Sequence, residues 1–310
     1  NTTASNNTAV GSSALGANTT GYSNTSVGHN SLDANTTGYN NVAVGKDALG
    51  QNTEGFQNVA IGKDALQTNS VGDHNIAIGV QALNGSTTGN ENLAIGKSAL
   101  AANTTGGSNM AIGVSAMSNS TTASYNYAIG NYAMQDITTG TANYAFGQNA
   151  LQNITTGNRN VAIGKNSMFT ATVAHDNVCI GEGAGYALTD GNAYYNVAIG
   201  SYALDAGTSA ASNVAIGYGA GGNTTTGDGN VYVGSFCAGL ATGAHTNTFI
   251  GANAGYDVTT GTNLVCIGHA AGYNAGNDIV DGTFGIYLGA FSMASAGNAS
   301  NEVVIGYNSQ

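Results

Sequence analysis

The sequence has no proline, no tryptophan and little charge: only 7% of its 310 residues are charged, where a typical soluble domain has about 25%. Because proline removes a backbone N–H donor, its absence favours a fold in which almost every backbone N–H donates a hydrogen bond. The 48 glycines do not recur at every third position, which excludes collagen. No apolar run approaches the ~18 residues of a membrane-spanning helix. The composition is unlike that of an ordinary enzyme.

Positive charge is scarce and unevenly placed. The net charge is −11, and residues 166–310 contain nine acids but no lysine or arginine. The five basic residues are Lys46, Lys63, Lys97, Arg159 and Lys165. Nucleic-acid binding needs clustered cations, so we expect no nucleic-acid partner, and binding to an anionic membrane is disfavoured for the same reason.

Residues that bind metals or perform catalysis form no recognisable set. Cys179, Cys237 and Cys266 have neither zinc-like spacing nor the even number of a disulfide framework, and we expect them to be small buried apolar residues. The five histidines do not recur in successive copies at one position of the repeat described below. No Ser/His/Asp or paired-carboxylate arrangement stands out. The sequence therefore predicts no cofactor, no metal and no enzymatic activity.

A short repeat runs along the whole chain. Asn-Val-Ala-Ile-Gly and close variants occur eighteen times, and fifteen of the seventeen intervals between copies are 17 residues, with one of 19 and one of 21. We call the last residue of each copy the motif glycine. The motif glycines are residues 11, 28, 45, 62, 79, 96, 113, 130, 147, 164, 181, 200, 217, 234, 251, 268, 289 and 306.

The repeat length and its internal pattern predict the fold. Seventeen residues are too few for two helices and their turns. Val59 and Ile61 alternate with Ala60, which is the period of a β-strand, and a second extended segment is expected at Ala65–Leu66 before a Thr/Gly turn. The sequence thus predicts an all-β, parallel β-solenoid of about 18 coils, stacked ~4.8 Å apart and forming one domain over residues 1–310.

The same alternation predicts which side chains face inward. Val59 and Ile61, with their equivalents in other coils, are expected to form two inward apolar columns, and Leu66 a third. Ala60 and its equivalents are then expected to form a small, flat outward face. Such a face suits packing against another copy, which predicts a parallel homo-oligomer, a trimer. The alternative is a solvated monomer in which small residues are merely tolerated on this face.

The unit Asn-Val-Ala-Ile-Gly-Lys-Asp-Ala-Leu (residues 58–66) resembles the head repeat of trimeric autotransporter adhesins, and is still more similar to Asn/Thr/Gly-rich repeats of bacteriophage tail fibres. The resemblance covers nearly the whole chain, although the adhesin repeat is shorter than 17 residues. It implies a trimer of left-handed parallel β-rolls used for attachment, outside the cell, on a virion tail or a bacterial surface. Residues 301–307 also resemble the segment that precedes a self-cleaving intramolecular chaperone in tail fibres, and the first residue is Asn1, so we expect a processed product or a fragment.

The repeat changes character along the chain. Residues 1–181 carry Ala-Leu or Ala-Met after the motif glycine, whereas residues 182–310 carry several Ala-Gly-Tyr segments and both longer intervals. Extra residues in a solenoid form loops, which commonly carry binding. In this second part the outward alanine position is expected to enlarge to Tyr232, Phe249 and Tyr287.

Aromatic and acidic residues of the second part are the candidate ligand-binding residues, because aromatic faces stack on sugars and carboxylates accept hydroxyl hydrogen bonds. They are Tyr186, Asp190, Tyr194, Tyr195, Tyr273, Asp278, Asp281 and Phe284. The alternative is that these aromatics pack between subunits. The expected function is fibrous attachment to a host cell or surface, with further copies of the chain and a cell-surface glycan or protein receptor as partners. The alternatives are a purely structural shaft whose receptor-binding tip lies elsewhere, and an ice-binding solenoid that uses its threonine columns.

Overall fold

The computed structural model describes residues 4–272 and 280–309 and shows an all-β, parallel β-solenoid with a 17-residue period, as the repeat predicts. Within these residues the chain forms eighteen parallel strands of three residues each and no helix. The strands are β1 (Thr8–Val10), β2 (Thr25–Val27), β3 (Val42–Val44), β4 (Val59–Ile61), β5 (Ile76–Ile78), β6 (Leu93–Ile95), β7 (Met110–Ile112), β8 (Tyr127–Ile129), β9 (Tyr144–Phe146), β10 (Val161–Ile163), β11 (Val178–Ile180), β12 (Val197–Ile199), β13 (Val214–Ile216), β14 (Val231–Val233), β15 (Thr248–Ile250), β16 (Val265–Ile267), β17 (Ile286–Leu288) and β18 (Val303–Ile305). The chain divides into two compact units, Asn1–Thr156 with β1–β9 and Gly157–Gln310 with β10–β18.

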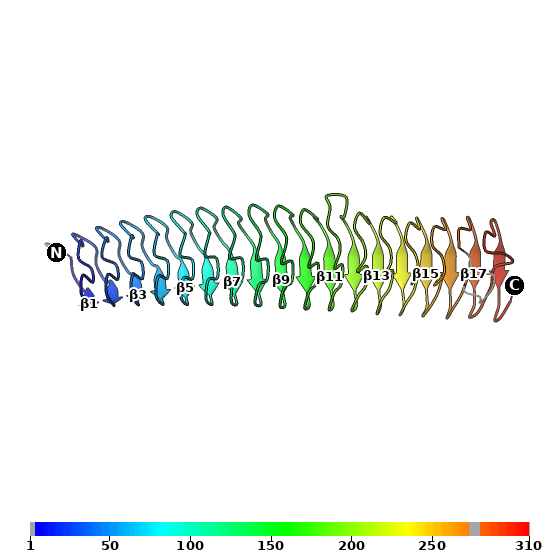
Figure 1. The fold of residues 1–310 in the computed structure, drawn as a ribbon, viewed down its shortest axis with the longest axis horizontal. Coiled ribbons are helices and arrows are strands. Elements are labelled where there is room, and N and C mark those ends of the chain that lie inside the picture. The colour runs from blue at the N-terminus through cyan, green and yellow to red at the C-terminus, as the bar shows by residue number, and fades with distance from the viewer. Residues whose placement is uncertain (1–3, 273–279, 310) are drawn as a thin grey trace. The chain divides into compact units, whose positions relative to one another are not determined.

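Each unit is a stack of coils in which equivalent residues lie directly above one another. In the first unit, β3 pairs with β4 so that Ala43 lies opposite Ala60. In the second unit, β12 pairs with β13 so that Ala198 lies opposite Ala215. Figure 1 shows the strands of each unit following one another side by side, with one coil leading to the next. Because every pairing keeps this register, each position of the repeat becomes a column of side chains.

Each coil consists of one strand followed by turns, and the motif glycine ends the strand. Gly45 has a φ of +137°, and a Cβ atom on it would lie 2.5 Å from the carbonyl oxygen of Gly62 in the next coil. Only glycine fits both the conformation and the close stacking of the backbones. The second extended segment expected at Ala65–Leu66 is wrong: Leu66 has a φ of +50°, so the chain turns there.

The predicted orientation of the strand residues is inverted. Ala60 is completely buried, whereas Ile61 is 40% exposed and Val59 is half-buried. The leucine column is confirmed as interior, since Leu66 is buried. The physical reason is the narrowness of a 17-residue coil: its interior already holds a leucine, a second alanine and an asparagine, which leaves room for only a methyl group at the middle of the strand. The β-branched residues keep their strand preference on the outer face.

Asparagine side chains fill the rest of the interior and join the coils. The backbone N–H of Asn75 donates to Oδ1 of Asn58 over 2.9 Å, and Nδ2 of Asn58 donates to the carbonyl oxygen of Gly72 over 2.8 Å. Both asparagines are completely buried. Repetition of this pattern satisfies the amides of the column that contains Asn58 and Asn75, and fixes the register of each coil on the next.

Large side chains replace alanine in the core of the second unit. Tyr232, Phe249 and Tyr287 are completely buried, so the expectation that they face outward is wrong. Glycines supply the space: a Cβ atom on Gly221 would lie 2.7 Å from the ring of Tyr232, and one on Gly255 would lie 2.5 Å from the ring of Phe249. Glycine four residues after a motif glycine, as in Ala254-Gly255-Tyr256, therefore complements a large residue in a strand.

Candidate functional site

The outer face of the strands carries two columns of apolar side chains in each unit. The residues just before the motif glycines are substantially exposed, with Ile61 at 40% and Ile216 at 38%. We call the apolar residues of these columns, from β3 to β9 and from β10 to β17, the apolar stripe of each unit. In the first unit the stripe contains Val42, Val44, Val59, Ile61, Ile76, Ile78, Leu93, Ile95, Met110, Ile112, Tyr127, Ile129, Tyr144 and Phe146. In the second it contains Val161, Ile163, Val178, Ile180, Val197, Ile199, Val214, Ile216, Val231, Val233, Ile250, Val265, Ile267, Ile286 and Leu288.

The predicted ligand-binding tyrosines form ring pairs with residues of the preceding coil. Tyr186 stacks on Phe169 with ring centres 5.3 Å apart. Tyr194 stacks on His175 at 5.4 Å and meets the edge of Tyr195 at 5.1 Å. The structure thus brings Tyr194 and Tyr195 together, whereas Tyr186 lies at a different corner of the coil, after the motif glycine.

The other predicted residues are dispersed. Asp190 lies in the longer interval between motif glycines 181 and 200, where its Oδ1 accepts from the backbone N–H of Asn192 over 2.9 Å and its Oδ2 accepts from the hydroxyl of Ser209. Asp281 and Phe284 are exposed and belong to the coil of β17, five coils beyond that of β12, or about 24 Å away at ~4.8 Å per coil. Tyr273 and Asp278 lie outside the described residues. The six described residues therefore do not form one site.

An ion pair lies beside the Tyr194–Tyr195 cluster. Nε of Arg159 is 2.6 Å from Oδ1 of Asp176, and Nδ1 of His175 is 2.9 Å from Oδ2 of the same carboxylate. The hydrogen bond from Arg159, with a further one from His175, lowers the pKa of Asp176 to about 2. Asp176 is therefore charged at neutral pH.

Lysine and aspartate form ion pairs at equivalent positions of two consecutive coils. Nζ of Lys46 is 2.9 Å from a carboxylate oxygen of Asp47, and Nζ of Lys63 is 3.3 Å from one of Asp64. Both lysine side chains are more than half exposed, so such a pair contributes about 0–1 kcal/mol to stability. These pairs form a solvated face.

The cysteines are buried and unpaired, as expected for small apolar residues. Burial raises the pKa of all three thiols, that of Cys237 to about 12. Across residues 4–272 and 280–309, no group of three His, Cys, Asp or Glu side chains is placed to hold a metal ion. In the same residues no helix is long and apolar enough to cross a membrane.

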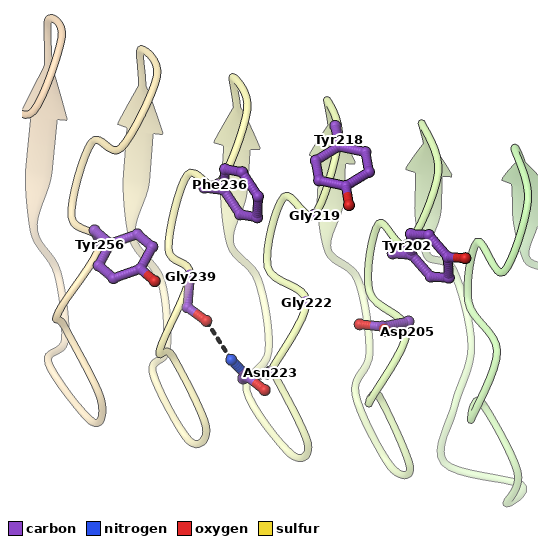
Figure 2. Close-up of a pocket in the computed structure, with 9 residues that line it drawn as sticks. All are labelled: Tyr202, Asp205, Tyr218, Gly219, Gly222, Asn223, Phe236, Gly239 and Tyr256. Carbon is purple, nitrogen blue, oxygen red and sulfur yellow. Dashed lines mark hydrogen bonds between the residues drawn. The ribbon is translucent and has the colours of Figure 1, made fainter.

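A second aromatic group, which the sequence did not single out, surrounds a trough in the second unit. Its rings belong to Tyr202, Tyr218, Phe236 and Tyr256, on four successive coils (Figure 2). These rings lie in ordinary coils, whereas the longer intervals were the expected place for binding residues. The available signal was the recurrence of aromatic residues one or two positions after motif glycines 200, 217 and 234.

A scan against protein-family models finds no match, and a search of curated proteins finds no significant relative.

Proposed function

We propose that the chain is a non-enzymatic, fibrous attachment segment that acts outside the cell, on a virion tail or a bacterial surface, as an assembly of parallel copies. The apolar stripe carries this proposal. It places β-branched side chains on solvent in coil after coil, and contiguous apolar surface of this kind marks an interface in a soluble protein.

The occupant that fits the apolar stripe best is another copy of the same chain. The columns repeat once per coil, so a second copy has side chains and gaps at the same ~4.8 Å spacing and can interdigitate along its length. The trimer follows from the resemblance to adhesin heads and tail fibres. The interface assigned here lies on the Val/Ile columns, whereas the alanine columns from which the sequence suggested it are buried.

The mass of the full chain in solution tests the assembly. We expect light scattering coupled to size-exclusion chromatography to give three copies for the native chain, and a smaller mass for a variant that carries both Ile78→Lys and Ile95→Lys in the stripe. The matched control is Val71→Lys, which alters an exposed valine outside the strands and should leave the mass unchanged. A monomeric native chain at micromolar concentration would contradict the proposal.

Attachment itself is tested by binding of the labelled chain to bacterial cells and to a glycan array. Binding supports an adhesive segment. An assembled chain that binds no surface would instead support the alternative of a structural shaft with its receptor-binding tip elsewhere.

The threonines that directly follow the buried asparagines do not favour the ice-binding alternative. The hydroxyl of Thr36 donates to the carbonyl oxygen of Thr53 over 2.9 Å, and that of Thr104 to Thr121 over 3.0 Å. Because these hydroxyls are used within the solenoid, we expect the native chain to give no thermal hysteresis, and a measurable value would revive this alternative.

A further inference from the structure

The trough of the second unit has the form of a ligand site. It has a volume of about 220 Å³ and lies over the coils of β12 to β15. Figure 2 shows Tyr202, Tyr218 and Phe236 in a row along one side, with Asp205 and Asn223 on the other and Tyr256 at the far end. Three of its rings are 42–50% exposed, so their faces and edges are available to a ligand.

Packing between coils holds the aromatic rings in place. The rings of Tyr218 and Phe236 meet edge to face with centres 5.1 Å apart, and those of Tyr202 and Tyr218 do so at 6.1 Å. Bare glycine backbone lies beneath them: a Cβ atom on Gly219 would be 3.1 Å from the ring of Phe236, and one on Gly239 would collide with the ring of Tyr256. The rings therefore present a fixed, preorganised surface.

The polar groups of the trough are hydrogen-bond acceptors. Asp205 is half-buried, and this burial raises the pKa of its carboxyl group while backbone N–H groups of Asp205 and Ala206 hold the charged form. Nδ2 of Asn223 donates to the carbonyl oxygen of Gly239, which orients the amide and leaves Oδ1 to accept. A ligand with several hydroxyl donors satisfies both groups.

The charge around the trough selects the class of ligand. No lysine or arginine occurs in residues 166–310, so a phosphate, sulfate or carboxylate ligand would meet no opposite charge. A single carboxylate does not hold a metal cation by itself. Aromatic faces combined with a few convergent acceptors suit a molecule that has apolar C–H faces and hydroxyl edges.

We propose that this trough binds a neutral oligosaccharide, with Tyr202, Tyr218 and Phe236 as stacking surfaces and Asp205 and Asn223 as acceptors of its hydroxyl groups. Four coils span three intervals, about 14 Å at ~4.8 Å each, which suits a short oligosaccharide better than a single sugar. The proposal names a ligand for the attachment function above and rests on it for its biological meaning.

Binding of the full chain to an array of neutral, sialylated and sulfated glycans tests the proposal, followed by calorimetric titration of the best neutral oligosaccharide. We expect Tyr202→Ala and Tyr218→Ala each to weaken the affinity about tenfold. Tyr132→Ala is the matched control: Tyr132 holds the same coil position as Tyr202, is similarly exposed (39% against 42%) and has the same left-handed backbone, yet lies in the first unit.

Two conservative variants separate binding from folding. Tyr202→Phe keeps the stacking ring and should retain most of the affinity, whereas Asp205→Asn keeps the shape and removes the charged acceptor, and should lose several-fold in affinity with an unchanged circular dichroism spectrum.

Three outcomes would overturn the trough as a neutral-oligosaccharide site. In the first, the native chain binds only anionic glycans. In the second, its glycan binding persists after both alanine substitutions. In the third, it binds no glycan at all. The attachment proposal is judged separately, by the mass of the assembly and by binding to cells, so an assembled chain that adheres to cells through another surface would refute only the trough.

Discussion

The buried asparagine column should be the main determinant of stability, and Asn75 is the residue on which to test it. Its Oδ1 accepts from the backbone N–H of Asn92 at 3.0 Å, and its Nδ2 donates to the carbonyl oxygen of Gly89 at 2.8 Å. Asn75→Ala removes both partners while the groups of Asn92 and Gly89 stay buried. An unsatisfied buried polar group costs about 1–3 kcal/mol, so we expect the free energy of unfolding to fall by about 2–6 kcal/mol.

Urea unfolding followed by circular dichroism measures this loss, and hydrogen exchange locates it, since the amide of Asn92 should lose its protection. Asn119→Ala is the control, because Nδ2 of Asn119 makes an exposed hydrogen bond to Asp136, whose removal should change the stability by less than about 0.5 kcal/mol. Equal effects of the two substitutions would refute the structural role of the column.

The variant Asn75→Asp adds a pH dependence of known sign. Burial raises the pKa of the new carboxyl group in the folded state above its unfolded value of about 3.9. The protonated acid can donate to Gly89, so its stability is retained below that value and is lost as the pH rises through the higher folded pKa. We therefore expect a lower unfolding midpoint at pH 7 than at pH 3, and a midpoint independent of pH would contradict burial of this position.

Three further predictions test which strand residues face inward, the ion pair of Asp176, and the packing of large strand residues against glycine in the second unit. Ala77→Leu overfills the interior and should lower the free energy of unfolding by about 1–3 kcal/mol or more, whereas Ile78→Ala on the outer face should lower it less in the isolated chain. The reverse order would support the orientation first expected from the sequence. The pKa of Asp176 is lowered from 3.8 to about 2, so its ion pair stabilises the fold above pH 4, and this stabilisation is lost between about pH 4 and 2. Asp176→Asn should lower the free energy of unfolding by no more than about 1 kcal/mol at pH 7. Denaturation at several pH values should show that the stability of this variant falls less than that of the native chain between pH 4 and 2. Gly255→Ala should lower the melting temperature because the added Cβ meets the ring of Phe249. The double variant Phe249→Ala with Gly255→Leu recreates the pair formed by Ala60 and Leu66 in the first unit, and should recover part of the loss. If the double variant recovers nothing, the large strand residue and the glycine do not compensate for each other.

The length of the repeat and the position of the strands were predictable from the sequence because both depend directly on which residues recur. Recurrence every 17 residues places equivalent residues on successive coils, and the alternation across Val59, Ala60 and Ile61 gives a strand. Alternation, however, does not say which of two opposite faces is inside. Apolar volume favoured Val59 and Ile61, but the narrow coil holds Ala60 inside.

The sequence did contain a signal for the true orientation. Asn58 is two residues before Ala60 and so shares its face, and an asparagine occupies this position in fifteen of the eighteen copies. So regular a polar residue is typical of an interior ladder, in which each amide bonds the backbone of the next coil. With Asn58 inside, Ala60 follows it inside.

The candidate ligand residues were harder to predict because ligand binding depends on the shape between coils. Tyr194 and Tyr195 were among the candidates, but their rings pack on each other and on His175. Tyr202 and Tyr218 surround a trough only because glycines of neighbouring coils leave space, and that information is spread over four copies of the repeat.

The proposed assembly and the proposed ligand binding use different positions of the same coil, and this separation follows from the inverted strand. Ile199 and Ile216, just before two motif glycines, belong to the apolar stripe, whereas Tyr202 and Tyr218, just after them, line the trough. A stack of similar coils can therefore vary the residues after the motif glycine without altering the apolar stripe. The proposed assembly of parallel copies would repeat each trough once per chain, so that weak binding at one trough would become strong attachment when neighbouring copies engage the same surface.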